Sequence, residues 1–325
     1  MLQAPVAMGV AFFARRTPWR GMGSPMLASA TRLPRVASPY RPPMPLEDLH
    51  VLDYLELAGS QARAGAALAM HQSTVSRSLQ LMQQEFRLEP ERGSPVCRHG
   101  HNPCLQHLRL ASREHRLMEG LLRIGTDVLH QSLLAGLAGV QRVPPRCRSG
   151  DHWAALVGHG LLDGAIVSAF SLPQPLPPGE ELRWDGLRAL PLGRLGLRLV
   201  AAPPGTRRVL LPPRGAAPLL HQAVVALGFV VEPQPVACQE PAAWVKRARD
   251  RGLALPLCPP LLGTDWLAAN GLEPLAELPP LEEELWLLLP EVAVNTNPAR
   301  QCLEGLRAVI SQAHVAAATK AEVQR

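Results

Sequence analysis

One short segment of the sequence concentrates side chains that bind metal ions. It contains, in order, Cys97, His99, His101, Cys104 and His107. Zinc accepts mixed cysteine and histidine ligands in a tetrahedral site. The spacing Cys-x-His-x-His-x2-Cys is not that of a standard zinc finger, however, and no second cysteine and histidine pair completes one. We therefore predict no metal site and no cofactor, and we keep zinc binding by this segment as the alternative.

No arrangement typical of an enzyme accompanies this segment. The sequence has no Gly-x-Ser-x-Gly, no Gly-rich phosphate loop ending in lysine and no His-Glu-x-x-His. Glu282, Glu283 and Glu284 are interpreted as a solvated turn and not as paired catalytic acids. The cysteines are too dispersed for a disulfide framework, which indicates reduced thiols. We therefore predict a cytoplasmic protein that is not an enzyme.

A second group of polar residues follows predicted strands. Apolar strands alternate with helices in the later part of the chain, which predicts an α/β fold with largely parallel sheets. In such folds ligands bind at the carboxyl ends of strands. The polar residues at those ends are Thr126, Asp127, Ser149 and Ser168. Ser149 and Gly150 would also present backbone amides at the start of a helix, which suits an anionic group. The alternative is that these residues only cap helices and form turns.

Length and composition limit the organisation of the chain. It has 325 residues, of which 47% are hydrophobic and 18% charged, as in an ordinary globular protein with two or three domains. Its 34 prolines break helices, so the second half should consist of short elements with many connections. The longest apolar stretch, 215–231, falls short of the roughly 20 residues that a membrane span needs. We therefore predict no contact with a membrane.

The positive charge of the chain lies in its N-terminal extension. Residues 1–44 contain six arginines, no lysine and no acid, which accounts for the whole formal net charge of +6. The extension is rich in Pro, Gly, Ser and Arg, and we expect it to be disordered. Three interpretations stay open: a misassigned start with Met44 as the true one, a tail that touches phosphates, and a targeting segment that is removed on import into an organelle.

Three short helices are predicted after the extension. Their limits are 46–58, 61–69 and 72–86. In the first, Leu49, Leu52 and Leu55 share a face, and the acids Asp48, Asp53 and Glu56 lie elsewhere. Gly59 and Ser60 then provide a stop and an N-cap. The second helix has small side chains, and the third is polar and nearly uncharged on its outer face. This pattern suits a helix-turn-helix whose third helix enters the major groove of DNA; the alternative is a three-helix bundle with a solvated polar face.

The residues of these helices resemble the helix-turn-helix of the LysR-type regulators. The matching positions, in order, are Ala58, Gly59, Ser60, Arg63, Ala64, Leu68, Gln72, Val75, Ser76, Arg77 and Leu79. The resemblance implies that double-stranded DNA is a partner. It implies a set of DNA-binding residues, to which the charged Arg98 of the following wing is added: Arg63, Gln72, Ser73, Thr74, Ser76, Arg77 and Arg98.

The sequence departs from the family pattern at several positions. His71 and Ser73 stand where the family usually has a small hydroxyl residue and proline, and His is a poorer N-cap than Ser. Arg87 replaces a usual glycine after the third helix. The wing at 92–98 lacks the family's Leu-Phe and Leu-Thr signatures. The cysteines and histidines that follow are interpreted as part of this wing, with imidazoles near phosphates.

The resemblance continues through the rest of the chain. Residues 104–120 resemble the family's linker helix, with Leu105, Leu108, Ala111 and Met118 partly on one stripe. In order, pieces of the family's effector domain then follow: a first strand at 122–126, a turn and strand at 160–167, a crossover strand at 197–201, a Gly-rich turn and strand at 252–256, a returning strand at 285–289 and a last helix at 298–312. Only about 25 residues separate Thr126 from Asp151, so the first lobe is expected to be trimmed.

Together these observations imply an α/β protein with an N-terminal all-α winged helix-turn-helix and a two-lobed effector domain like a periplasmic binding protein. The predicted limits are 1–44 for the extension, 45–103 for the DNA-binding domain, 104–120 for the linker helix and 121–318 for the effector domain. The implied function is that of a bacterial transcription regulator, a homodimer or tetramer that responds to a small-molecule effector, for which an anionic one is favoured. The alternative is a small-molecule-binding or interaction protein of the same fold whose DNA-binding domain is degenerate.

Overall fold

The structure is a computed structural model that describes residues 46–323, apart from 92, 203–204, 234–239, 263 and 276–277. The extension at 1–44 therefore lies outside the described residues, as do Arg92 of the predicted wing and Cys238. The predicted domain limits stay predictions.

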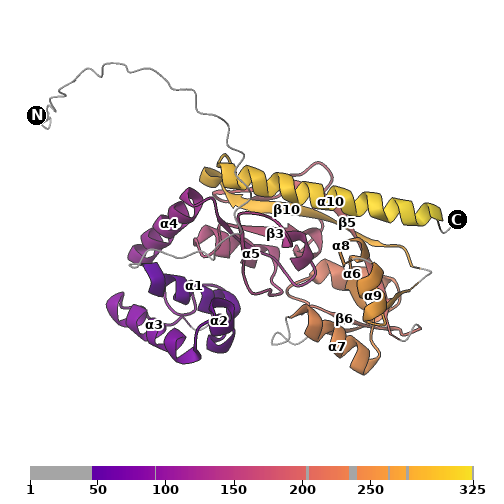
Figure 1. Cartoon of the computed structure of the whole chain (residues 1–325), viewed down its shortest axis with the longest axis horizontal. Helices are drawn as coiled ribbons and strands as arrows, with labels where there is room; N and C mark the ends of the chain where they lie inside the picture. Colours follow the sequence, from indigo (N-terminus) through magenta and orange to yellow (C-terminus); the bar gives the residue numbers. More distant parts are fainter. Residues whose placement is uncertain are drawn as a thin grey trace, which may run out of the picture. The chain divides into compact units, whose positions relative to one another are not determined.

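The first three described helices are those predicted for the helix-turn-helix. They are α1 (Glu47–Ala58), α2 (Gln61–Leu68) and α3 (Gln72–Glu85), and they pack against one another (Figure 1). Gly59 ends α1 with φ at 77°, and the Ser60 hydroxyl accepts a bond from Arg63 N at 3.3 Å. His71 begins α3 without a side-chain cap bond, as its poor capping ability predicts. The caps read from the sequence are thus confirmed.

Two acids of α1 are buried together with its apolar residues. Every residue of this helix from Leu49 to Ala58 is buried. Asp53 is 1% exposed and Glu56 is 3% exposed. Burial of a carboxylate is tolerated only with a cationic partner, and arginines from later parts of the chain supply it. The predicted leucine face is therefore buried, and the burial of the two acids adds to what the sequence predicted.

The segment after α3 is a loop. We call residues 86–102 the α3–α4 loop; where they are described they contain no strand, and Glu91 N donates to Arg98 O at 3.1 Å to close the loop. Arg87, which stands where the resemblance expects glycine, has φ at +50°. An L-residue is strained in this left-handed region, whereas glycine is not.

Arg87→Gly is expected to stabilise the protein by roughly 0.5–1 kcal/mol, because relief of strain outweighs the added freedom of the unfolded chain. The measurement is the free energy of unfolding by urea titration. Arg87→Ala is the matched control, since it removes the same charge and keeps the strained φ. An equal gain in both variants would assign the effect to charge and contradict the prediction.

The helix predicted as a linker buries a different face from the expected one. This helix is α4 (Pro103–Met118), with Asn102 as its N-cap. Leu105 is buried and Leu108 packs against the same cluster, whereas Ala111 is exposed and Met118 is 83% exposed, so the predicted apolar stripe holds only for its first two members. The buried residues are Leu105, Arg109, Ser112, Arg113 and Arg116. The packed face of α4 is therefore largely cationic and is held by ion pairs within the chain.

The first lobe is a mixed sheet in the order β2-β1-β3-β10-β5-β4. The strands are β1 (Leu122–Gly125), β2 (Val140–Arg142), β3 (Gly164–Ser168), β4 (Arg183–Trp184), β5 (Leu187–Ala201) and β10 (Leu281–Pro290). β1 pairs in parallel with β2 and β3, and β10 runs antiparallel to β3 and β5. The other described elements of this part are the turn η2 (Gln131–Leu134), α5 (Gly150–Gly158) and the turn η3 (Ala169–Ser171).

The second lobe begins where β5 leaves the first sheet. Residues 198–201 of β5 pair with β8 (Leu255–Leu257) and β9 (Glu273–Pro274). The strands β6 (Arg208–Leu211) and β7 (Val230–Pro233) pair in parallel, and a bridge from Val209 to Ala254 joins them to the β8 segment. The helices of this lobe are α6 (Pro218–Ala226), α7 (Pro241–Arg251), α8 (Pro259–Leu262) and α9 (Thr264–Ala269).

The two-lobed architecture predicted from the sequence is confirmed by these pairings. β5 crosses into the second lobe and β10 returns to pair with β3, as expected for residues 197–201 and 285–289. The last helix, with the turn η4 (Glu291–Ala293) before it, is α10 (Asn297–Val323), which lies along β5 (Figure 1). Among the described helices, none has the length and apolarity needed to cross a membrane.

Candidate nucleic-acid interface and ligand pocket

The N-terminal turn of α3 presents polar side chains to solvent. Gln72, Ser73 and Arg77 are exposed, whereas Thr74 and Ser76 are half-buried. Gln72 Nε2 donates to Gln61 Oε1 of α2 at 3.2 Å. Amide, hydroxyl and guanidinium groups are the donors and acceptors that read base edges and phosphates. This turn therefore has the chemistry and the exposure that a recognition helix needs.

The small residues of α2 allow α3 to approach closely. Ala64 is fully buried, as is Val75 of α3. A Cβ atom added to Gly65 would lie 2.7 Å from Met70 O in the turn between the helices. The prediction that small side chains serve close helix packing is therefore confirmed, and this packing fixes the direction of α3.

Arginines from three segments gather beside the turn between α1 and α2. Arg63 is half-buried on α2, and Arg98 of the α3–α4 loop is bound by Glu56, with Nε 3.1 Å from Oε1. Burial, and then the charges of Arg98 and Arg63, lower the pKa of Arg146. Sequence reasoning missed Arg146, because no motif marks its loop. The contribution of Arg98 to binding phosphates is reduced by its ion pair, and the roles of Arg63 and Arg98 stay predictions.

A network of buried charges joins α1, α4 and β1. Asp53 of α1 accepts from Arg109 Nε of α4 at 2.8 Å and from Arg123 Nη1 of β1 at 3.3 Å. The Arg123 side chain is fully buried, with Nη2 2.8 Å from His50 Nδ1. Burial, and then the charge of Arg123, lower the pKa of His50 to about 2, so its ring is neutral. One carboxylate of the predicted DNA-binding domain thus pairs with the linker helix and the first strand of the α/β region.

A second carboxylate completes the buried charge network. Asp163, in the turn before β3, accepts from Arg116 Nε at 2.8 Å and Nη2 at 2.5 Å. It also accepts from the backbone N–H of Arg123 at 2.7 Å. Paired, bidentate contacts of this kind are the strong form of charge-assisted hydrogen bond. The C-terminal half of α4 is therefore fixed to the turn between α5 and β3.

The predicted effector residues are fixed within the chain to different degrees. Thr126 is fully buried, and its Oγ1 has no hydrogen-bond partner among the described residues. Asp127 accepts from the backbone N–H groups of Leu129 and His130, at 2.8 and 3.2 Å. Ser149 caps α5 through a bond from His152 N at 3.3 Å. Ser168 donates to the carboxylate of Glu283.

Glu283 is not part of a solvated turn. It lies in β10 and is 2% exposed, which overturns the interpretation of Glu282–Glu284. His130 Nε2 lies 2.7 Å from Glu283 Oε1, and His130 Nδ1 lies 2.8 Å from Asp127 Oδ1. Burial alone would lower the pKa of His130, but the two carboxylates outweigh it and raise this pKa well above its ordinary value. The sequence signal that was missed is the alternation along the strand, which places Glu283 on the same buried face as Leu281 and Leu285.

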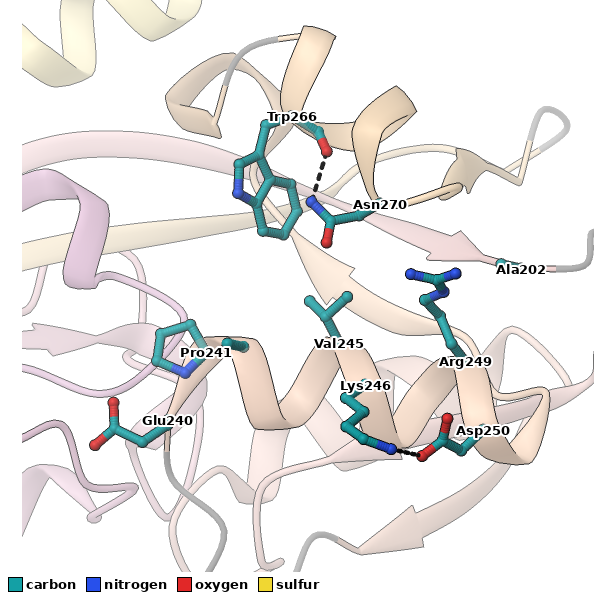
Figure 2. A pocket seen from close by; sticks show the side chains of 10 residues that line it. Ala202, Glu240, Pro241, Val245, Lys246, Arg249, Asp250, Trp266 and Asn270 are labelled. Carbon is teal, nitrogen blue, oxygen red and sulfur yellow. Dashed lines mark hydrogen bonds and ion pairs between the residues drawn. The ribbon is translucent and has the colours of Figure 1, made fainter.

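A pocket of about 330 Å³ lies between the two lobes. On one side it is lined by residues that follow β1, among them Val128, Ser132 and Arg142, and on the other by Trp244 and Trp266 of the second lobe. A larger and more open pocket of about 900 Å³ lies next to it, between α7 and α9 (Figure 2). The pockets share Pro241, Val245 and Trp266. None of the four predicted effector residues lines either pocket.

One further group of side chains has the composition of a metal site. Cys97 and His101 of the α3–α4 loop meet His159, which follows α5, with all three ligand atoms within 4.8 Å of one another. Sequence reasoning singled out Cys97 and His101 but missed His159, because its proximity depends on tertiary packing.

Comparisons with known proteins were made with both the sequence and the structure. No model of a protein family matches the sequence, and no curated protein matches it. Solved structures similar to this chain include ArgP from Mycobacterium tuberculosis, with 17% identity, a TM-score of 0.45, and coverage of 81% of this chain and 96% of that chain. LysG from Corynebacterium glutamicum with bound effector Arg has 16% identity, a TM-score of 0.37, and coverage of 81% and 98%. CbnR complexed with its target DNA has 13% identity, a TM-score of 0.41, and coverage of 81% and 99%. Among these similar structures, CbnR is a LysR family transcriptional regulator.

Proposed function

We propose that this protein is a sequence-specific DNA-binding transcription regulator that responds to a small molecule. The observation that carries the proposal is the exposed, polar first turn of α3 on a closely packed three-helix unit. Such a turn places Gln72, Ser73 and Arg77 where side chains of a recognition helix meet base edges. Arg63 and Arg146 add positive charge at the turn between α1 and α2, for phosphate contacts.

The pocket between the lobes is the proposed effector site. Its walls are mainly apolar and include two tryptophans, while Gln131, Ser132 and Arg142 supply polar groups. A pocket of this kind suits a small molecule with an apolar or aromatic body and an anionic group near Arg142. The anionic effector suggested by the sequence is thus kept, but its proposed site moves away from Thr126, Asp127, Ser149 and Ser168.

The buried charge network is the proposed route between the two sites. Asp53 contacts Arg123, which lies in β1. Val128, which lines the proposed pocket, follows Arg123 by only a few residues along the chain. A ligand that changes the geometry of the lobes would act on α1 through this contact. We further propose a cytoplasmic, bacterial protein that binds as a homodimer or tetramer, because two-fold operators require paired recognition helices.

Arg77→Ala is expected to weaken specific DNA binding by about 1–3 kcal/mol, roughly 5- to 150-fold, because an exposed guanidinium at a base edge or phosphate is lost. Binding is measured on a fragment from upstream of the protein's own gene, beside a scrambled fragment, at two salt concentrations. Log affinity should fall linearly with log salt concentration.

Arg300→Ala, an exposed arginine on α10, is the matched control for loss of charge and should leave binding unchanged. The unchanged protein could instead bind both fragments weakly and equally, with the same affinity as Arg77→Ala. A selection from random DNA sequences would then follow. Failure to select any sequence would refute a DNA-binding regulator.

Ser132→Trp is expected to fill the pocket between the lobes and abolish ligand binding there. The probes are benzoate and other small aromatic carboxylates, and the measurement is the rise in melting temperature with probe concentration. A Ser311→Trp variant, on an exposed position of α10, is the control. A probe that still stabilises the Ser132 variant as strongly as the unchanged protein would place the effector site elsewhere.

A second candidate function is favoured by the α3–α4 loop. The described residues of this loop contain no strand, and Arg98 is paired with Glu56. The loop therefore differs from a wing that contacts DNA phosphates. A small-molecule-binding or interaction protein with a degenerate DNA-binding domain would have this property. It predicts pocket binding that is lost in Ser132→Trp together with DNA binding that is weak and indifferent to sequence.

A further inference from the structure

Three metal-binding side chains from separate elements converge where the α3–α4 loop meets the end of α5. The ligand atoms of Cys97, His101 and His159 all lie within 4.8 Å of one another. We propose that these three residues bind a transition-metal ion that prefers thiolate and imidazole ligands, and that this ion is Zn²⁺. The site is independent of DNA recognition by α3 and of the proposed effector pocket.

The two loop ligands are held in place by the backbone around them. Cys97 has φ at +56°, and its carbonyl oxygen accepts from Gly100 N at 3.0 Å, so a tight turn fixes the cysteine. His101 directly precedes Asn102, which caps α4 by accepting from Leu105 N at 2.8 Å. Asn102 Nδ2 also donates to Phe86 O at 2.7 Å. A non-glycine residue in the left-handed region is strained, and such strain is typical of functional positions.

The third ligand is brought to the loop by packing between α4 and α5. His159 is the C-cap residue of α5. Gly160 follows with φ at +73°, and a Cβ atom there would lie 3.2 Å from Arg109 Cβ of α4. Gln106 Nε2 donates to Gly158 O at 3.4 Å. The approach of His159 to the loop therefore follows from close contact of two helices and not from the reach of one long side chain.

A buried arginine contacts the sulfur of Cys97. Arg109 Nη1 donates to Cys97 Sγ at 3.2 Å, and the charge of Arg109 is balanced by Asp53 at 2.8 Å. Hydrogen bonds of this outer kind orient metal ligands and stabilise their charge. His101 Nδ1 is buried without a hydrogen-bond partner among the described residues.

The ligand set selects the class of ion. Zn²⁺ takes cysteine sulfur and histidine nitrogen, and three protein ligands leave a fourth tetrahedral position for water. Copper also accepts one cysteine and two histidines, in a trigonal arrangement. Bound there, an ion would link the α3–α4 loop, next to the recognition helix, to α5 of the first lobe. Metal binding would therefore connect the α3–α4 loop directly to α5 through coordination bonds.

The test is metal binding by the full-length protein after removal of metals with a chelator and reduction of its thiols. Co²⁺ serves as a coloured substitute for Zn²⁺, since a tetrahedral thiolate site gives it a sulfur-to-metal absorption band. We expect one Co²⁺ per chain with this band, displaced by one equivalent of Zn²⁺. The metal content of the protein as purified is measured beside this titration, and bound copper in place of zinc would overturn the assignment of zinc.

Variants with matched controls locate the site. Cys97→Ser should remove the sulfur band, and His159→Ala should weaken binding by more than the roughly 10- to 100-fold that loss of an outer partner costs. Cys104→Ser and His107→Ala change exposed residues of α4 and should bind as the unchanged protein does. His159→Ala is the informative variant if Cys97→Ser does not fold, because His159 is only half-buried. The proposal is wrong if the unchanged protein shows no saturable binding, or if His159→Ala binds as tightly as the unchanged protein.

Discussion

Replacing Asp53 with alanine is expected to lower the free energy of unfolding by about 3–5 kcal/mol, the usual cost of removing one partner from a buried ion pair. Asp53 is 1% exposed and balances two buried arginines, Arg109 and Arg123. Without it, both guanidinium groups stay in an apolar interior with less compensation. The measurement is urea unfolding at pH 7, followed by circular dichroism. A loss of this size is a large part of the 5–15 kcal/mol that stabilises an ordinary protein.

Glu47→Ala is the control for Asp53→Ala. Glu47 lies in the first turn of the same helix and is exposed, so its removal should cost no more than about 1 kcal/mol. A loss below about 1 kcal/mol for Asp53→Ala, equal to that of the control, would mean that the buried network does not hold α1 against the α/β region.

The second large effect is expected at Glu283. Glu283→Gln keeps the shape of the side chain and removes the charge that faces His130 at 2.7 Å. We expect a loss of about 3 kcal/mol near pH 6, because a buried cationic ring then keeps only Asp127 as a charged partner. The measurement is the free energy of unfolding of both proteins between pH 6 and pH 10.

The size of the Glu283 effect should depend on pH in a defined direction. The pKa of His130 is raised in the folded protein, so the folded state binds its proton more tightly than the unfolded state does. This contribution is fully present below the unfolded pKa of about 6.5 and is lost as pH rises through the folded pKa. The difference between the unchanged protein and Glu283→Gln should therefore shrink as pH rises. Glu282→Gln, at the exposed neighbouring position, should change stability by less than about 0.5 kcal/mol at every pH, and a pH-independent difference for Glu283→Gln would contradict the assignment to His130.

Local signals in the sequence were sufficient for most elements. The stop at Gly59 and the cap at Ser60 separate the first two helices, and the first strand was predicted within one residue of β1. The exposed polar face of α3 also follows from helical periodicity, because polar side chains occupy one side of a short amphipathic helix. The position of Arg87 is a further local signal. The resemblance expects glycine there, and Arg87 has the positive φ that favours glycine.

The polar interior could not be predicted from local patterns. Asp53 and Arg116 lie far apart in the sequence, and both are of residue types that usually occupy solvent-exposed helix positions. Their burial depends on partners in other elements, which periodicity does not reveal. The same holds for His159 and Glu283, whose partners meet only through the packing of α4 on α5 and of β10 on β3. An acid that shares a strand face with apolar residues, as Glu283 does with Leu281 and Leu285, is the local signal that indicates burial.

The sharing of Asp53 between two arginines has a consequence for how this sequence can evolve. A change at Asp53 removes the paired carboxylate from two cations at once, while a change at Arg109 or Arg123 alone leaves the carboxylate with one partner. Effects of substitutions in such a contacting group are not additive. Single substitutions at Asp53 are therefore strongly disfavoured, and descendants of this chain reach an uncharged version only if an arginine is replaced first. The order of mutations, and not only their identity, constrains divergence at the junction between its helical and α/β parts.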